Sequence, residues 1–384
     1  MRRPTRIRGF SADQDRMVAQ SCPDLRDYSA DFSIKVKSRR VTEQLCATPS
    51  ATSVGTPLVS IIVNNYNYGR FLGEAIDSAL AQTYPNKEVI VVDDGSRDNS
   101  REVIAGYGRR ILPVLKENGG QASAFNAGFK ASKGELILFL DSDDMLEPEA
   151  IETTAREWRD GVARMVFPLE VVDKSGRPLG KTVGGKELPS PALGPFGVGT
   201  PTSGNVFSRA ALEKILPMPE EGWRIAADLF LTAACLFGET LCLRQPLGKY
   251  RVHRDAGHPQ DNVVWAVTTH VSLDLKLHDT LFRLTGGKIG SLEHWLSACP
   301  QHWIMRIKSL RESPNDYPWP DSLPGLTLRA IKATWRQPDR NFRRRLAYSI
   351  FAFGYAVLPK KATGAMWRVD GGERGRVLKR LLGT

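Results

Sequence analysis

The chain has 384 residues, of which 41% are hydrophobic and 25% charged, so it is long enough for one large globular domain or two smaller ones. Lysine and arginine exceed aspartate and glutamate by 11, so the surface should attract anions such as phosphorylated small molecules, acidic lipids or nucleic acid. The five cysteines form no CxxC pair and have no regular spacing, which argues against a zinc ribbon or a disulfide framework and favours a reducing compartment.

The sequence of the N-terminal region predicts neither a secretory signal nor a folded domain. It begins with the basic MRRPTRIRGF, and no apolar segment follows, so we expect no secretory signal. Residues 1–56 show neither helical nor strand periodicity and predict a flexible basic arm. The longest apolar stretch, at 348–359, is shorter than the about 20 residues that a membrane-spanning helix needs. We therefore predict a cytoplasmic protein whose only membrane contact is peripheral, at the inner face of the cell membrane.

From residue 58 onward, segments typical of strands alternate with segments typical of helices. The strand-like segments are VSIIV (59–63), KEVIVV (87–92), ILPVLK (111–116) and ELILFL (135–140), and the helix-like ones are FLGEAIDSALAQ (71–82), SREVIAGYG (100–108) and QASAFNAGFKAS (121–132). Continuous β-branched runs are typical of strands buried on both faces, and the alternation predicts parallel βαβ units. RMVFPLEVVD (164–173) predicts one more strand, and a Gly/Pro-rich loop is expected over 176–204.

Polar clusters follow three of these strands, where a parallel sheet binds its ligands. They are Asn64 to Asn67, Asp93 to Ser96, and Asp141-Ser142-Asp143-Asp144. Three carboxylates within four residues repel one another, and a divalent cation would neutralise them; oxygen ligands favour Mg²⁺ or Mn²⁺. The alternative is that these acids cap the helix beginning near 147. An EF-hand loop fits poorly, because Met145 is not a ligand and the glycine after it is missing.

The other two clusters fit a nucleotide. A carboxylate at 93–94 would accept the N3–H of a uracil or thymine ring, although Asp-Gly is also a strong turn former. Tyr66 would present its ring or backbone to the same base. The Asn118-Gly119-Gly120-Gln121 segment opens a helix, and its small residues would let the backbone approach a phosphate.

These residues also carry a family resemblance. The run VSIIVNNYNYGRFLGEAIDSALAQTYPNKEVIVVDDGSRDNS, followed by NGGQASAFNAGFKASKGELILFLDSDD, resembles the family 2 glycosyltransferases and their GT-A fold. The resemblance implies that Tyr66 and Asp94 contact the donor base, Asp141 the ribose and Asp143 the metal bridging the diphosphate. Family members commonly have Ala-Arg-Asn where this chain has Ala124-Phe125-Asn126, so one arginine contact to the donor is missing. The predicted donor-binding residues are Tyr66, Asp94, Gly120, Asn126, Asp141 and Arg251.

The resemblance also implies a general base for an inverting transfer. The counterpart of the family's acidic residue at a helix start is Asp228, in AADLFL; a two-residue shift would place Ala226 there and leave Asp228 a helix cap, with Glu220 and Glu221 as reserves. Thr202-Ser203-Gly204-Asn205 resembles the acceptor-side loop. Tyr250-Arg251-Val252-His253 resembles the Tyr-Arg-x-His segment, in which His253 would join Asp143 at the metal or meet the departing diphosphate and Arg251 would add positive charge.

The predicted protein is thus an α/β enzyme with three regions: a flexible basic arm (1–56), a GT-A-type, Rossmann-like, mostly parallel sheet flanked by helices (57–255), and a helical basic C-terminal region (256–384). Its predicted activity is the metal-dependent transfer of a sugar, with inversion, from a nucleotide-diphosphate sugar to a hydroxyl of a glycan or lipid-linked acceptor. A UDP-sugar is the favoured donor, and the predicted process is polysaccharide or cell-envelope synthesis. From 328 to 384 the chain has 14 Lys/Arg against three Asp/Glu, interleaved with aromatic residues. That composition fits an anionic membrane surface or a merely solvated basic face, and we expect no nucleic-acid partner.

Two rival interpretations remain at the level of sequence. A catalytically impaired nucleotide-sugar-binding relative fits the missing arginine. A sugar nucleotidyltransferase would also use strand-end carboxylates, but no Gly-rich segment with a lysine follows the first strand.

Overall fold

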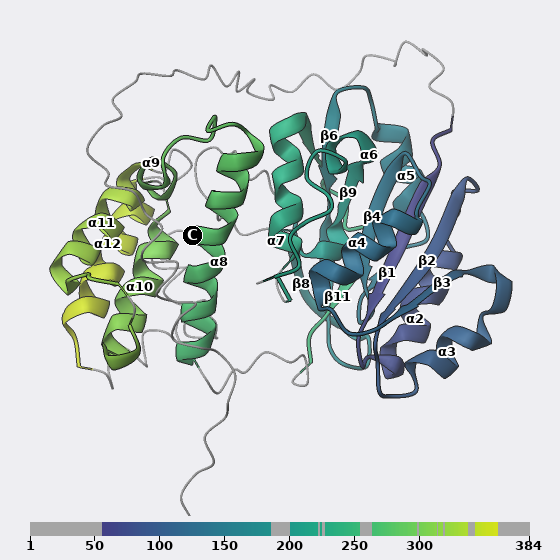
Figure 1. The fold of residues 1–384 in the computed structure, drawn as a ribbon, viewed down its shortest axis with the longest axis horizontal. Helices are drawn as coiled ribbons and strands as arrows, with labels where there is room; N and C mark the ends of the chain where they lie inside the picture. The colour runs from purple at the N-terminus through teal and green to yellow at the C-terminus, as the bar shows by residue number, and fades with distance from the viewer. Residues whose placement is uncertain are drawn as a thin grey trace, which may run out of the picture.

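The structure is a computed structural model that describes residues 56–185, 200–253 apart from 222, 225 and 226, and 263–359 apart from 298, 313, 318 and 337–341. Figure 1 shows an α/β half, in purple to teal, beside a helical half, in green to yellow. The predicted basic arm lies outside the described residues except for residue 56. The predicted fold class is confirmed: a mostly parallel sheet flanked by helices, followed by a helical region.

The main sheet has seven strands among the described residues, in the order β10-β6-β9-β4-β1-β2-β3. β1 lies between β2 and β4 and is parallel to both, β2 is parallel to β3, and β9 runs antiparallel to both of its neighbours. All seven residues of β1 are buried, as its continuous apolar run predicts. The strands are β1 (Val59–Asn65), β2 (Lys87–Asp94), β3 (Leu112–Lys116), β4 (Leu136–Asp141), β6 (Val162–Val166), β9 (Asn205–Ser208) and β10 (Glu239–Cys242).

Helices cover both faces of this sheet. Two separate clusters of buried side chains result, because successive residues of a strand point to opposite faces: Ile61 and Val63 belong to one cluster and Ile62 to the other. On the first face lie α2 (Gly69–Leu80), α3 (Ser100–Gly106) and α5 (Ala150–Glu157); α4 (Gln121–Ala131) lies on the second. Short helices in this half are η1 (Gly108–Arg110), η3 (Thr202–Gly204), α6 (Arg209–Leu212), α7 (Asp228–Leu231) and η4 (Thr232–Phe237).

The single strand predicted for 164–173 is wrong, because the structure divides this segment between two sheets. β6 ends at Val166 in the main sheet, and β7 (Pro168–Val172) begins a second one. Proline at 168 has no N–H for the main sheet's ladder, and Phe167 instead donates its N–H to the carbonyl of Gly204. The second sheet has the order β5-β11-β7-β8, with β5 (Met145–Leu146), β8 (Pro178–Gly184) and β11 (Gly248–Arg251).

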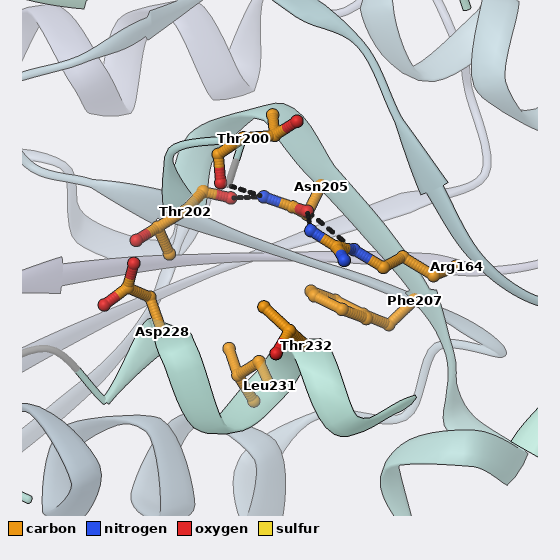
Figure 2. A pocket seen from close by; sticks show the side chains of 8 residues that line it. All are labelled: Arg164, Thr200, Thr202, Asn205, Phe207, Asp228, Leu231 and Thr232. Carbon is orange, nitrogen blue, oxygen red and sulfur yellow. Dashed lines mark hydrogen bonds between the residues drawn. The ribbon is translucent and has the colours of Figure 1, made fainter. Parts of the chain in front are cut away.

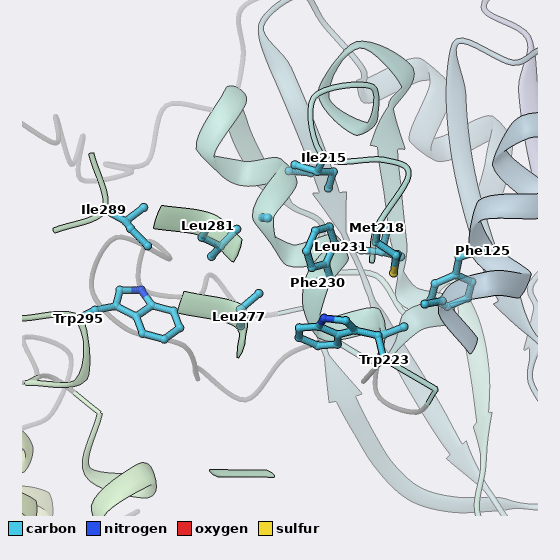
Figure 3. Packing of buried hydrophobic residues seen from close by; sticks show 14 of the residues in the cluster. Phe125, Ile215, Met218, Trp223, Phe230, Leu231, Leu277, Leu281, Ile289 and Trp295 are labelled. Atoms are coloured by element: carbon cyan, nitrogen blue, oxygen red, sulfur yellow. The ribbon is translucent and has the colours of Figure 1, made fainter. Parts of the chain in front are cut away.

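The helical half consists of α8 (Val263–Leu284), α9 (Leu292–Leu296), α10 (Pro300–Glu312), η5 (Pro314–Asp316), α11 (Leu323–Arg336) and α12 (Phe342–Val357). One hydrophobic cluster runs from the second face of the sheet through Trp223 and Phe230 to Leu277 and Trp295 of the helical half (Figure 3). The two halves therefore share buried surface, and the domain boundary predicted at 255 stays a prediction. No helix among the described residues is long and apolar enough to cross a membrane.

Trp223 is central to this shared cluster, since it is 1% exposed and its ring lies edge-on to Phe230 at 5.6 Å. Trp223→Ala is expected to lower the free energy of unfolding by about 3 to 5 kcal/mol, because it leaves a cavity where two elements meet. Chemical denaturation followed by circular dichroism measures this change. The control is Trp335→Ala, which removes a 40% exposed indole and should cost about 1 kcal/mol or less. Equal losses for the two variants would contradict the shared core.

Candidate active site

The three predicted polar clusters do meet at one edge of the main sheet. In the registers of the parallel pairs, Asn64 is opposite Asp141 and Asn65 is opposite Asp93. The amide of Asn65 donates to the Asp93 carboxylate at 3.0 Å, which ties the first two clusters together. The prediction that these strand ends form one rim is therefore confirmed.

The three acids at the end of β4 are held in a tight turn, in which the Asp144 N–H donates to the Asp141 carbonyl at 3.0 Å. Burial, helped by the nearby carboxylates of Asp143 and Asp228, raises the pKa of Asp141 to about 8. Burial, helped by the carboxylates of Asp143 and Asp141, raises the pKa of Asp144 well above its usual value. The turn thus concentrates negative charge that the protein itself leaves partly uncompensated, and a cation would relieve this repulsion.

Asp143 and His253, predicted to share a metal, lie in direct contact. His253 Nε2 is 2.9 Å from Asp143 Oδ2, and the imidazole is almost completely buried. The ring lies 4.9 Å from the ring of Phe71 and 5.5 Å from that of Tyr68, so aromatic packing fixes its orientation. Its Nδ1 is buried without a hydrogen-bond partner.

This pair fits a small hard cation that keeps positions for other ligands. Two adjacent ligands bound at about 2.1 Å and at right angles are about 3 Å apart, close to the separation of these two atoms. Among the described residues, no group of three or more His, Cys, Asp or Glu side chains is arranged to hold a metal ion. A metal at Asp143 and His253 would therefore take its remaining ligands from phosphate oxygens and water, as Mg²⁺ usually does.

Arg251 and Ser203 hold the acidic turn in place. Arg251 is buried; its backbone N–H donates to Asp144 Oδ1 at 2.9 Å and its Nε to the Asp143 carbonyl at 2.9 Å. The guanidinium also donates to Glu74 Oε2 at 2.7 Å. The Ser203 hydroxyl donates to Asp144 Oδ2 at 2.7 Å and accepts from the Asp141 N–H at 3.1 Å. The sequence analysis selected both segments, but it did not predict that Arg251 and Ser203 hold the acidic turn in place.

Asp228 is the first residue of α7, close enough to Asp141 to raise the pKa of that carboxyl. Figure 2 shows it facing Thr202 across a small hollow between α7 and the segment 200–205. The position before the helix belongs to Ala227, which makes no side-chain cap, so Asp228 is not the residue at the cap position. Ala226, the alternative under a shifted alignment, lies outside the described residues.

The wall of the hollow opposite Asp228 is fixed by a buried arginine. Arg164 is 2% exposed and donates to Asn205 Oδ1 from Nε at 2.9 Å and from Nη2 at 2.5 Å. The amide nitrogen of Asn205 donates in turn to the carbonyls of Pro201 and Thr202 at 2.7 and 3.1 Å. The turn that carries Ser203 is therefore anchored to β6 through these two side chains.

Asp94 organises the glycine segment before α4. Oδ1 accepts from Lys116 Nζ at 2.6 Å and from the Gly119 N–H at 2.9 Å. Oδ2 accepts from the Gly120 N–H at 2.7 Å and from Asn118 Nδ2 at 3.1 Å. Gly120 has φ +87°, and a side chain there would collide with the backbone of Arg224. Glycine is thus required at 120 for both its conformation and its space.

Two residues of the first cluster have polar side-chain groups that the described residues do not fully engage. The Tyr66 side chain is exposed. Asn64 is 9% exposed, and both polar atoms of its amide are buried with no hydrogen-bond partner. Because buried polar groups are nearly always paired, this amide needs a partner from outside the described residues, such as an ordered water or a ligand. The sequence placed Asn64 in the cluster without selecting it, and its only signal was its position at a strand end.

Asn126 and Phe125 lie on α4 and face the protein interior. Asn126 binds the backbone of Met218 in both directions, with 2.9 Å from its Nδ2 to the carbonyl and 2.9 Å from the Met218 N–H to its Oδ1. Phe125 is fully buried 4.7 Å from the ring of Phe139, which explains why an apolar residue stands where the family commonly has arginine. The reserve base Glu220 is exposed and accepts from Asn126 at 3.3 Å.

Comparison with known proteins agrees with this arrangement. Residues 60–215 match the family model "Glycosyl transferase family 2". An uncharacterized glycosyltransferase of Nostoc sp. is 37% identical over 213 residues, covering 52% of this chain and 66% of the relative. An uncharacterized glycosyltransferase of Rickettsia typhi is 52% identical over 97 residues, covering 25% of this chain and 30% of the relative. The chain thus spans less than two thirds of the length of these relatives.

Among solved structures, S. aureus TarS 1-349 in complex with UDP-GlcNAc is similar at 17% identity with a TM-score of 0.47, covering 81% of this chain and 91% of the other. The family match includes Tyr66, Asp94, Asp141 and Asp143, whereas Asp228, Arg251 and His253 follow it in the chain. Residues 60–215 thus form a domain that matches glycosyl transferase family 2 and is similar to these glycosyltransferases.

Proposed function

We propose that this protein transfers a sugar, with inversion, from a nucleotide-diphosphate sugar to a hydroxyl of a glycan or lipid-linked acceptor. The observation that carries the proposal is the placement of Asp228 beside the acidic turn at 141–144, close to Asp141 and across the hollow from Thr202. A single displacement needs carboxylates that bind the donor and a separate carboxylate that deprotonates the acceptor hydroxyl. The acidic turn and Asp228 are the candidates for these two roles.

The donor nucleotide binds at the ends of β1 and β2. In this proposal the exposed Tyr66 offers its ring to the base and Asp141, at the end of β4, binds the ribose. The free amide of Asn64 offers one donor and one acceptor, which matches the adjacent N3–H and carbonyl of uracil and favours a UDP-sugar. Asp94 and Gly120 contribute by shaping the loop that the nucleotide would contact, because both Asp94 oxygens are already used there.

The diphosphate binds beside Asp143 and His253, the residues that would hold Mg²⁺ or Mn²⁺. A bound divalent cation supplies positive charge that stabilises the leaving diphosphate. Arg251 keeps the turn in position through the Asp143 carbonyl and the Asp144 carboxylate. Because Arg251 is buried and bonded to Glu74, its contribution to donor binding is to hold the acids rather than to reach the phosphate itself.

Transfer begins when Asp228 accepts the proton of the acceptor hydroxyl. The acceptor oxygen forms a bond to the anomeric carbon, the bond from that carbon to the diphosphate oxygen breaks, and the nucleoside diphosphate leaves with the electron pair. Attack opposite the leaving group inverts the anomeric centre.

A thermal-shift screen of UDP-, GDP- and dTDP-sugars, each with Mn²⁺ and with EDTA, tests donor binding. A donor at about 100 times its Kd stabilises the folded state by about 2.7 kcal/mol, which for a chain of this size corresponds to roughly 3 to 4 °C in the unfolding temperature. We expect this shift for a UDP-sugar with Mn²⁺ and its loss in EDTA, because a cation held by Asp143 and His253 would supply positive charge for the diphosphate.

The matched variants for this screen are Asn64→Ala and Asn86→Ala. Asn64→Ala should reduce the shift, because the unpaired amide is lost, and Asn86→Ala should not, because Asn86 precedes β2 at the opposite end of the strand pair. A shift of the same size in EDTA would remove the metal from the proposal. No shift with any donor would remove the donor site.

A further inference from the structure

Helix α12 carries an exposed apolar stripe on one side. The five residues are Phe342, Leu346, Ile350, Phe353 and Val357, which are 65%, 44%, 62%, 56% and 59% exposed. At 100° per residue they fall within an arc of about 80°, so they form one continuous line along the helix. Large apolar side chains gathered in this way on a surface mark a contact with a partner or a membrane.

The opposite side of α12 is already packed. Ala352 and Tyr355 are buried against α10 and α11, and the Tyr355 hydroxyl donates to Glu312 Oε1 at 3.0 Å. Arg311 also donates to the Tyr355 and Leu358 carbonyls near the end of the helix. These contacts fix the orientation of α12, and its apolar stripe stays exposed. The helix lies on the side of the helical half away from the sheet (Figure 1).

The stripe continues onto α11 and is bordered by positive charge. The Trp335 ring lies edge-on to Phe342 at 5.6 Å and is itself exposed. Lys332 and Arg336 of α11 and Arg343 of α12 are exposed nearby. Between residues 323 and 357 the chain has seven Lys/Arg and one Asp/Glu.

We propose that this face, the α12 stripe with its basic border, docks onto an anionic lipid surface. An apolar helix face flanked by lysine and arginine matches the acyl boundary of a bilayer below anionic headgroups. Other occupants are disfavoured by charge. The N-terminal residues 1–55 have ten Lys/Arg against six Asp/Glu, residues 360–384 have seven against two, and a second copy of the chain carries net charge +11. All of them would be repelled by the basic border.

This binding rests on the surface of α11 and α12 alone and does not depend on the proposed sugar transfer. It is therefore tested by flotation of the full chain with vesicles at physiological salt, without any donor or acceptor. Wild type should float with vesicles of phosphatidylcholine mixed with phosphatidylglycerol and stay at the bottom with phosphatidylcholine alone. Absence of flotation with the mixed vesicles, or equal flotation with both, would overturn the proposal.

Ile350→Glu combined with Phe353→Glu tests the stripe itself. Both side chains are more than half exposed, so the variant should keep its thermal unfolding midpoint while its apparent affinity for mixed vesicles falls about tenfold or more. The matched control is Leu112→Glu with Leu179→Glu, which changes two exposed leucines on strands β3 and β8 and should float as wild type does. Flotation of the Ile350/Phe353 variant at the wild-type level, or equal loss in the control, would contradict the assignment.

Discussion

Replacement of Asp143 by alanine is expected to lower the rate of sugar transfer by about a thousandfold, or roughly 4 kcal/mol in the activation free energy. The reason is that Asp143 is the acid of the turn that contacts His253 and keeps a partly exposed carboxylate, so it is the residue placed to hold a cation against the diphosphate. Folding should be unaffected, because Asp143 is not part of either hydrophobic cluster. The rate is measured with the UDP-sugar that shows the largest thermal shift.

The control is Asp160→Ala, since Asp160 is an exposed aspartate outside the site and should leave the rate unchanged. The Asp143→Ala variant should also lose the Mn²⁺-dependent part of the donor shift. If this variant transferred sugar in Mn²⁺ as fast as wild type, the metal assignment would be wrong, whatever the result for donor binding.

Replacement of Asp228 by asparagine is expected to slow transfer by about a hundredfold to ten-thousandfold, the usual contribution of a general base. Asparagine keeps the size of the side chain but cannot accept the acceptor's proton, so donor binding should persist. The measurement is the transfer rate together with the donor thermal shift of the same preparation. This pairing separates an enzyme from a relative that only binds nucleotide sugars.

Glu220→Gln and Glu221→Gln serve as comparisons, because both residues are exposed and were the reserve candidates. Neither should change the rate more than a few-fold. A large loss in either of them, with normal transfer by Asp228→Asn, would move the base to that glutamate and contradict the role given to Asp228.

The central sheet and its rim were predictable because their signals are local. The continuous apolar runs of β1 and β4 and the polar residues directly after them predict buried strands and a ligand edge without reference to any distant residue. The segment 164–173 was not predictable in the same way. Pro168 interrupts this segment, but the pairing of its two halves with different sheets depends on strands far away in the chain: β6 pairs with β9 and β10, and β7 pairs with β8 and β11.

The same limit applies to the side chains that support the site. Asp94 and Arg251 were expected to face the donor, and only the fold shows that the first holds the glycine segment and the second holds the acidic turn. Ser203 and Asn205 stand in a motif that the sequence assigned to the acceptor. Their bonds to Asp144 and Arg164 join segments 40 or more residues apart, which no local pattern contains.

The saturated carboxylate of Asp94 also affects the thermodynamics of ligand binding. Lys116, Asn118, Gly119 and Gly120 are already fixed by it before any nucleotide arrives. Ordering a flexible backbone costs about 1 to 2 kcal/mol per residue in conformational entropy. The conformational entropy of this segment is already lost when the chain folds, before a nucleotide binds. Less of the nucleotide's interaction energy is therefore used to order the segment, and more of it contributes to affinity.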